Sequence, residues 1–216
     1  EYVRTLAIQL ESGRLPTPIK VIQERDVDAS LGAESLEKSL LAGVIGLVLV
    51  GLFMLIYYRL PGFLAALALA AYTVIVLSIF KLIPVTLTLS GIAAFILSVG
   101  MAVDANILIF ERMKEELHLG RTLRTAVEVG FDRAWTSIRD SNISTLITCI
   151  ILWWFGDRMG TSLVVGFAVT LAIGVLISMF TAITISRTLM RVIALSPLAR
   201  HLGLYLPIRV KQPNDL

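Results

Sequence analysis

Long apolar runs dominate the pattern of hydrophobic and polar positions along this chain. A helix needs about 20 residues to cross a hydrocarbon layer of ~30 Å, and most of the runs reach that length. The fourth run is short, but extending it back through Trp135–Asp140 gives a spanning length. The runs are continuous rather than alternating, which favours helices over a β-barrel. We therefore expect five transmembrane helices, at about Ser39–Tyr58, Pro61–Phe80, Thr86–Phe110, Ser141–Phe155 and Thr161–Ser186.

The composition agrees with this fold class. Hydrophobic residues make up 56% of the chain and charged residues 16%, which is too apolar for a soluble domain of 216 residues. The single cysteine, Cys149, lies in an apolar run and reads as a small packed hydrophobe. His118 and His201 have no neighbours at the spacing of metal ligands. We expect an all-α membrane protein that is not an enzyme and holds no metal or cofactor.

Residues 1–35 differ from the rest because they are mixed and polar. Tyr2, Leu6 and Leu10 recur every four residues, which predicts a short amphipathic helix. The β-prone run Ile19–Ile22 follows two prolines and predicts a short strand. We interpret this segment as the α/β end of an extracytoplasmic domain. No leader-like segment precedes the first apolar run, so we expect the chain to be a piece of a longer protein.

Basic residues predict the orientation, because short cytoplasmic loops are rich in Lys and Arg. Only Lys81 and Arg158 lie in the loops on the opposite side. The N-terminal segment is therefore expected outside, residues 36–190 in the membrane region and residues 191–216 in a cytoplasmic tail. The basic residues on the cytoplasmic side are Arg112, Lys114, Arg121, Arg124, Arg133 and Arg139 in the long connection, and Arg187, Arg191, Arg200, Arg209 and Lys211 at the C-terminal end.

The connection Glu111–Arg139 is itself amphipathic. Leu117, Leu123, Val127 and Phe131 recur at helical spacing among charges, with Gly120 and Gly130 as expected breaks. The pattern predicts one or two interfacial helices at the cytoplasmic surface. A solvated helical linker is the alternative.

Asp104 is the strongest candidate for a functional residue. It interrupts an apolar run, where an ionised carboxylate costs about 2.5–3.5 kcal/mol on insertion scales. Gly100 lies one turn before it on the same face and would let a neighbouring helix approach closely. Burial favours the neutral form of a carboxyl group, so Asp104 is a candidate to take up and release protons. The alternative is an aspartate that caps a helix, bonds a partner helix or lies at the interface because the helix ends early.

A second polar cluster opens the fourth run, and its members would form one stripe on a helix. Such a stripe can hold water or bond another helix, although Ser and Thr in spans often serve packing alone. An N-terminal capping role is the alternative for Asp140. The cluster consists of Ser137, Asp140, Ser141, Ser144 and Thr148.

The last run carries small residues at every fourth position. Such a seam predicts tight contact with another helix, and packing is its default interpretation. Its members are Gly166, Thr170, Gly174, Ser178 and Ala182.

The stretch from Gly100 to Arg112, GMAVDANILIFER, resembles the signature of SecD proteins, in the SecD/SecF family of protein-export membrane subunits. The resemblance continues over almost the whole chain up to about Pro197. Ser141 departs from the usual alanine. The other matching segments are Ser12–Pro18, Ser30–Ser35, Asp140–Leu146, Gly166–Leu171 and Ser178–Ala182.

The resemblance implies the second to sixth spans of a six-span unit of the RND superfamily, in the bacterial inner membrane. It implies an auxiliary subunit that pairs with SecF, associates with the SecYEG channel and uses the proton gradient to help unfolded polypeptides cross the bilayer. No nucleic-acid partner is implied. Asp104 matches the family's proton-path aspartate, and Asp140 stands where SecF carries an arginine. The supporting polar or close-packing positions are Gly100, Asn106, Asn142, Ser144, Thr148 and Thr170.

Three other functions fit parts of the pattern. An RND-type exporter of small molecules would share the intramembrane carboxylate but needs a ligand pocket outside the membrane. A scaffold without proton chemistry would need none of these residues. An intramembrane protease would need Asp104 and Asp140 close enough to share a proton, and no Gly-x-Gly-Asp stretch surrounds Asp104.

Overall fold

The computed structural model describes residues 3, 4, 7, 29–83, 88–196 and 205 of the chain. It divides into a unit Glu1–Glu34 and a unit Ser35–Leu216. Within the described ranges every regular element is a helix, which confirms the all-α class. The expected N-terminal helix falls almost wholly, and the expected strand wholly, outside these residues. The elements are α2 (Ala29–Tyr58), α3 (Leu60–Leu82), α4 (Leu89–His118), α5 (Leu123–Arg158), α6 (Ser162–Thr181), the π-helical turn η1 (Ala182–Ser186) and α7 (Arg187–Ala194).

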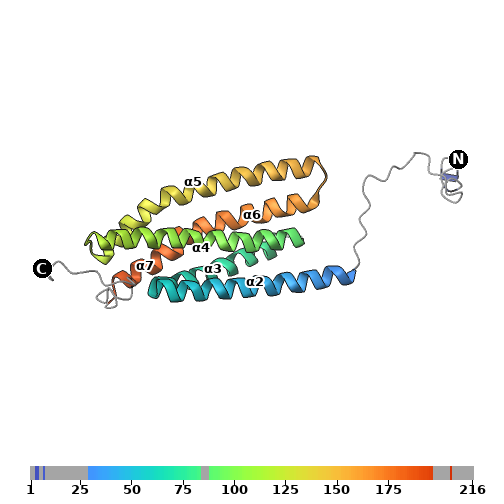
Figure 1. Ribbon diagram of the computed structural model, residues 1–216. Helices are drawn as coiled ribbons and strands as arrows, with labels where there is room; N and C mark the ends of the chain where they lie inside the picture. The colour runs from blue at the N-terminus through green and yellow to red at the C-terminus, as the bar shows by residue number, and fades with distance from the viewer. Residues whose placement is uncertain (1–2, 5–6, 8–28, 84–87, 197–204, 206–216) are drawn as a thin grey trace. The chain divides into compact units, whose positions relative to one another are not determined.

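Helix α4 is the centre of the bundle. It packs against α5 and α6, which also pack against each other, while α3 contacts both α4 and α6 (Figure 1). Helix α2 leads into α3 and exposes most of its apolar surface. The core is formed by the inner faces of α3, α4, α5 and the continuous helical path α6–η1–α7. The face of α4 or α5 on which a polar candidate lies therefore decides whether it contacts the core or is exposed.

Four helical segments are long and apolar enough to cross a membrane: Glu34–Tyr58, Leu60–Leu82, Leu89–His118 and Ser162–Ala194. They account for four of the five expected spans. The fifth is part of α5, which does not reach the same apolarity because Asp140, Asn142, Asp157 and Arg158 flank or enter its apolar stretch. Its crossing of a membrane stays a prediction. It is nevertheless a single helix of 36 residues that packs on α4 and α6.

The connection between α4 and α5 differs from the expected one or two interfacial helices, because it is not separate from the long helices. Residues 111–118 continue α4, residues 123–139 begin α5, and only a short turn separates them. Gly120 is the expected break and has a positive φ of 80°. Gly130 does not break α5. A Cβ there would lie 2.9 Å from Met113 Cα, so this glycine allows the two helices to touch.

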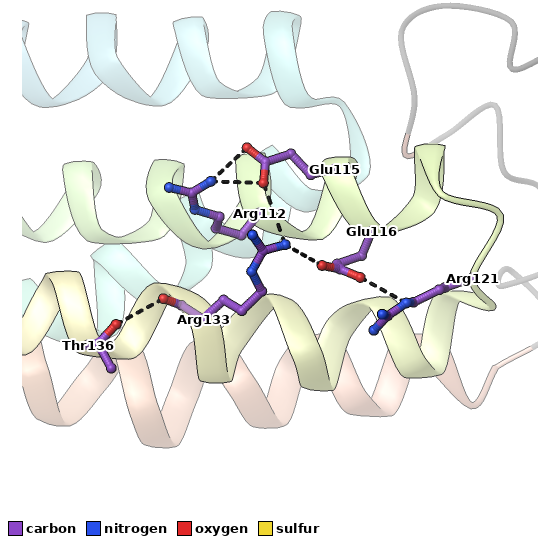
Figure 2. A network of polar contacts seen from close by, with 6 residues as sticks. All are labelled: Arg112, Glu115, Glu116, Arg121, Arg133 and Thr136. Carbon is purple, nitrogen blue, oxygen red and sulfur yellow. Dashed lines mark hydrogen bonds and ion pairs between the residues drawn. The ribbon is translucent and has the colours of Figure 1, made fainter.

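Ion pairs fix this turn (Figure 2). The Glu116 side chain is only 2% exposed and lies between Arg133 and Arg121, with Arg121 Nε 3.0 Å from Glu116 Oε2. Glu115 is half exposed and accepts hydrogen bonds of 2.8 Å from Arg112. Charges that the sequence assigns to a cytoplasmic loop thus join two long helices into a hairpin.

The α2–α3 turn is tighter still. Arg59 alone connects the two helices and adopts a positive φ of 52°. Pro61 occupies the first turn of α3, where the missing backbone donor has no partner to lose. A Cβ on Gly62 would lie 1.9 Å from the Met54 carbonyl oxygen, so only glycine fits there. The Lys114 ammonium lies 4.3 Å from the centre of the Tyr58 ring, which ties the end of α2 to α4.

Candidate functional site

Asp104 lies near the middle of α4, on the face of that helix that this chain leaves open. Exposed positions recur along this face at Ala93, Leu97, Gly100 and Asp104, at spacings of three or four residues. Among the described residues Asp104 makes no hydrogen bond or ion pair. The capping alternative is wrong, because the helix continues for 14 residues to His118. The expected burial of Asp104 is also wrong for this chain alone.

The opposite face of α4 explains why Asp104 points outward. Asn106, two residues further along, is 4% exposed, and Ser98 is fully buried. Two residues of an α-helix are about 200° apart, so Asn106 and Asp104 occupy opposite sides. The inner side holds α4 against α6, and the outer side is exposed.

Ser98 lies where three helices meet. Its Oγ lies 2.7 Å from the Tyr72 hydroxyl of α3. A Cβ on Gly174 of α6 would lie 2.5 Å from Ser98 Cβ. A similar approach brings Gly166 to Thr88, and Thr170 is 1% exposed. These contacts confirm that the small-residue seam of the last run is a surface of tight helix contact.

Asn106 is joined to the far end of that seam. Ser186 is the last residue of η1, and its Oγ donates a 2.7 Å hydrogen bond to Asn106 Oδ1. Asn106 Nδ2 donates to the Ala102 carbonyl at 3.3 Å, so both ends of the buried amide have partners. Sequence reasoning missed Ser186, although the seam extended by four residues from Ala182 reaches it.

Asp140 also faces outward, on α5. Its side chain is 66% exposed, and the neighbouring Arg139 lies 3.0 Å away. It cannot be an N-terminal cap, because α5 begins 17 residues earlier at Leu123. The members of the predicted hydroxyl stripe are exposed as well. Ser144 and Thr148 donate hydrogen bonds within their own helix, Ser144 to the Asp140 carbonyl at 3.0 Å and Thr148 to the Ser144 carbonyl at 3.0 Å. Asn142 differs, since it is 8% exposed and faces inward.

The two aspartates lie at about the same height along the α4–α5 hairpin. Met113 and Gly130 mark a crossing of the antiparallel helices. Asp104 lies nine residues before Met113 on α4, and Arg139 lies nine residues after Gly130 on α5. Because the helices are antiparallel, both positions are at about the same distance along the hairpin from this contact. Both carboxylates nevertheless face away from the α4–α5 contact, and within the described ranges no bond joins them. This arrangement does not support a shared-proton protease dyad.

A charged cluster that the sequence did not predict joins α5 to α7. Arg187 lies 2.8 Å from Glu128 and 3.0 Å from Asp132, and Arg191 donates to Glu128 at 2.7 Å. Hydrogen bonds from Arg191 and then Arg187 lower the pKa of Glu128 to about 2. Glu128 and Asp132 are four residues apart on α5, and Arg187 and Arg191 are four residues apart on the last helix. These equal spacings of opposite charges were the signal in the sequence that could have predicted the cluster.

A cavity of about 220 Å³ lies beside this cluster, between α4, α5 and η1. Its walls are largely apolar, and Asp132 and Arg187 supply the charged groups. The lining residues are Ile109, Phe131, Asp132, Trp135, Ile138, Ala182, Ile183 and Arg187.

Comparison with known proteins places these features in a family. Residues 11–192 match the family model described as "Protein export membrane protein SecD/SecF, C-terminal". The chain is 59% identical over 205 residues to the protein translocase subunit SecD of Thermobaculum terrenum, a match covering 95% of this chain and 40% of the relative. It is 59% identical over 191 residues to that of Synechocystis, covering 88% of this chain and 40% of the relative. The chain thus spans about two fifths of the length of these relatives.

A solved structure gives the same result. The crystal structure of SecDF, a translocon-associated membrane protein from Thermus thermophilus, has a TM-score of 0.78 and 38% identity. The match covers 88% of this chain and 26% of that one. A second SecDF structure, in the super-membrane-facing form, has a TM-score of 0.72 at the same identity, covering 88% and 25%.

Proposed function

Because this chain belongs to the SecD/SecF family of protein export membrane proteins, we propose that it forms the membrane-embedded, proton-responsive part of an accessory subunit of the Sec protein translocase. In this role it couples proton flow to the export of unfolded polypeptides. The activity is transport, with no covalent chemistry. The cytoplasmic side is the one that carries the α4–α5 turn and α7, where basic residues concentrate.

The observation that carries the proposal is the position of Asp104. It is a carboxylate within an apolar helix, and it is exposed in the described part of the chain. An ionised carboxylate in such a position is costly unless a charged group or water meets it, whereas the protonated form is tolerated. The two protonation states therefore favour different surroundings for α4. This difference is what converts proton binding into helix movement.

A partner must complete the site. Helix α4 exposes apolar residues and Asp104, and α5 exposes apolar residues and Asp140, so a second helical unit covering both surfaces would bury these two carboxylates. The solved SecDF relative supports SecF as that unit, and its description as translocon-associated supports contact with SecYEG. A proton moving down 100 mV supplies about 2.3 kcal/mol, so several protons are needed for a large movement.

The experiment compares Asp104→Asn with Asp157→Asn in the full-length protein with its partner subunits, in membrane vesicles. Asp157 is an exposed carboxylate at the end of α5, so its variant controls for the loss of a charge. We expect Asp104→Asn to lose the export stimulated by the proton gradient while the subunits still copurify. Asp157→Asn should keep both. Full gradient-stimulated export by Asp104→Asn would leave a scaffold role in place of proton coupling.

A further inference from the structure

The last helical segment is held in two different ways above and below η1. Above it, α6 lies against α4 through small residues, and Gly174 and Gly166 leave no room for a Cβ beside Ser98 and Thr88. Below it, α7 is attached to α5, through Arg187 and Arg191 on Glu128. Helix α6 also packs against α5, so what changes at the π-helical turn Ala182–Ser186 is the kind of contact: close helix packing before it and ion pairs after it.

A π-turn adds one residue to a helical turn and weakens the regular hydrogen bonding, which makes it a preferred place for bending. In this chain a hydrogen bond to α4 restrains the π-helical turn on one side. Ser186 is 3% exposed and Asn106 is 4% exposed, and the 2.7 Å hydrogen bond between them is a buried contact between η1 and α4.

Asn106 shares its short stretch of α4 with Asp104, on the opposite face. A rotation or tilt of α4 that follows protonation of Asp104 must therefore move Asn106 relative to Ser186. The cavity of about 220 Å³ on the α5 side of η1, lined by Ile109, Trp135 and Ile183 among others, provides space into which the turn can move.

We propose that η1 is a hinge, and that the Ser186–Asn106 hydrogen bond couples its bending to the state of Asp104. This inference rests on the proton-coupled function proposed above and extends it to the last helix. Ser186 and Asn106 are positioning residues, since neither carries the proton. In this proposal the buried bond passes the movement of α4 to η1 and to α7.

The test uses the full-length protein with its partner subunits in membrane vesicles. Ser186→Ala removes the hydroxyl group, and Ser186→Thr restores one. Ser178→Ala is the matched control, because Ser178 is also buried in the last helix but its hydroxyl bonds only the Val175 carbonyl of the same helix. Ile183→Cys, in the cavity wall, reports movement through its rate of labelling by a maleimide with and without a proton gradient.

We expect gradient-dependent labelling at position 183 in the otherwise unchanged protein. Ser186→Ala should abolish that dependence and lower gradient-driven export about fivefold, the effect of losing one buried hydrogen bond. Ser186→Thr and Ser178→Ala should keep the gradient-dependent labelling and the gradient-driven export. All variants should assemble normally. Labelling that ignores the gradient, or an unchanged gradient response in Ser186→Ala, would overturn the hinge. If Asp104→Asn still blocks export in that case, the proton-coupled function stands without the hinge.

Discussion

Gly174 of α6 lies so close to Ser98 of α4 that an added Cβ would come 2.5 Å from both Cβ and Oγ of the serine. The Tyr72 hydroxyl, 3.0 Å from the same point, closes the remaining side. Gly174→Ala must therefore push α6 away from α4. We expect it to destabilise the bundle by about 1–3 kcal/mol, the usual cost of overpacking a core.

Thermal unfolding of the purified protein in detergent measures this effect. Gly51→Ala is the control, since a Cβ there meets nothing within 4 Å. Its unfolding midpoint should be unchanged or slightly higher. Equal midpoints for Gly174→Ala and Gly51→Ala would show that the contact between α4 and α6 is not tight in the membrane.

Gly100 gives the opposite prediction. A Cβ at this position meets no atom of the chain within 4 Å, and the residue shares the open face of α4 with Asp104. Gly100→Leu should therefore keep the stability of the bundle but obstruct a helix that packs on this face. We expect about tenfold weaker association with SecF, the proposed partner, equivalent to about 1.4 kcal/mol. Copurification at the level of the unchanged protein would mean that the face does not meet the partner.

The α4–α5 turn tests the role of a buried charge. Glu116 is 2% exposed between two arginines, whereas Glu115 is 48% exposed. Glu116→Ala leaves arginines without their buried partner and should cost about 1–3 kcal/mol. Glu115→Ala loses only surface ion pairs, worth about 0–1 kcal/mol. Denaturant unfolding that ranks the two variants equally would contradict this description of the turn.

Glu128 predicts how the attachment of α7 responds to pH. Its folded-state pKa of about 2 is lower than the ~4.3 of an unpaired glutamate. A lowered folded-state pKa stabilises the folded state at pH values above ~4.3, and this contribution is lost as the pH falls towards 2. Hydrogen exchange of α7, corrected for its intrinsic pH dependence, should be constant from about pH 5 to 8 and rise below about pH 4.

Glu128→Gln should reproduce the faster exchange of α7 at neutral pH, because the amide cannot form the same ion pairs. Glu115→Gln, which changes a carboxylate in the last turn of α4, should leave α7 unaffected. Protection of α7 that is unchanged in Glu128→Gln would show that the apolar contacts of Met190, which is 1% exposed, hold it alone.

The sequence predicts the elements better than their contacts. Run length and apolarity locate α2, α3, α4 and the last helical segment, because these properties are local. The small-residue seam also identifies a contact correctly. Gly130 shows the limit, since a glycine among charges reads as a break but serves the approach of α4 and α5.

The outward position of Asp104 could not be predicted for a different reason. Helical periodicity shows which residues share a face, but it does not show whether that face meets the same chain, a partner or lipid. The Ser186–Asn106 bond and the α5–α7 ion pairs join residues 55 to 80 positions apart. Such contacts depend on how helices are arranged in space, which no local pattern contains.

The proposed function rests on the claim that Asp104 takes up a proton within the membrane. Infrared difference spectroscopy detects the carbonyl band of a protonated carboxyl group directly, in the full-length protein with its partner subunit in a lipid bilayer. Between about pH 8 and about pH 5.5, where exposed carboxylates stay ionised, we expect a band that is lost in Asp104→Asn and kept in Asp157→Asn. The same band in Asp104→Asn as in the unchanged protein would contradict the claim.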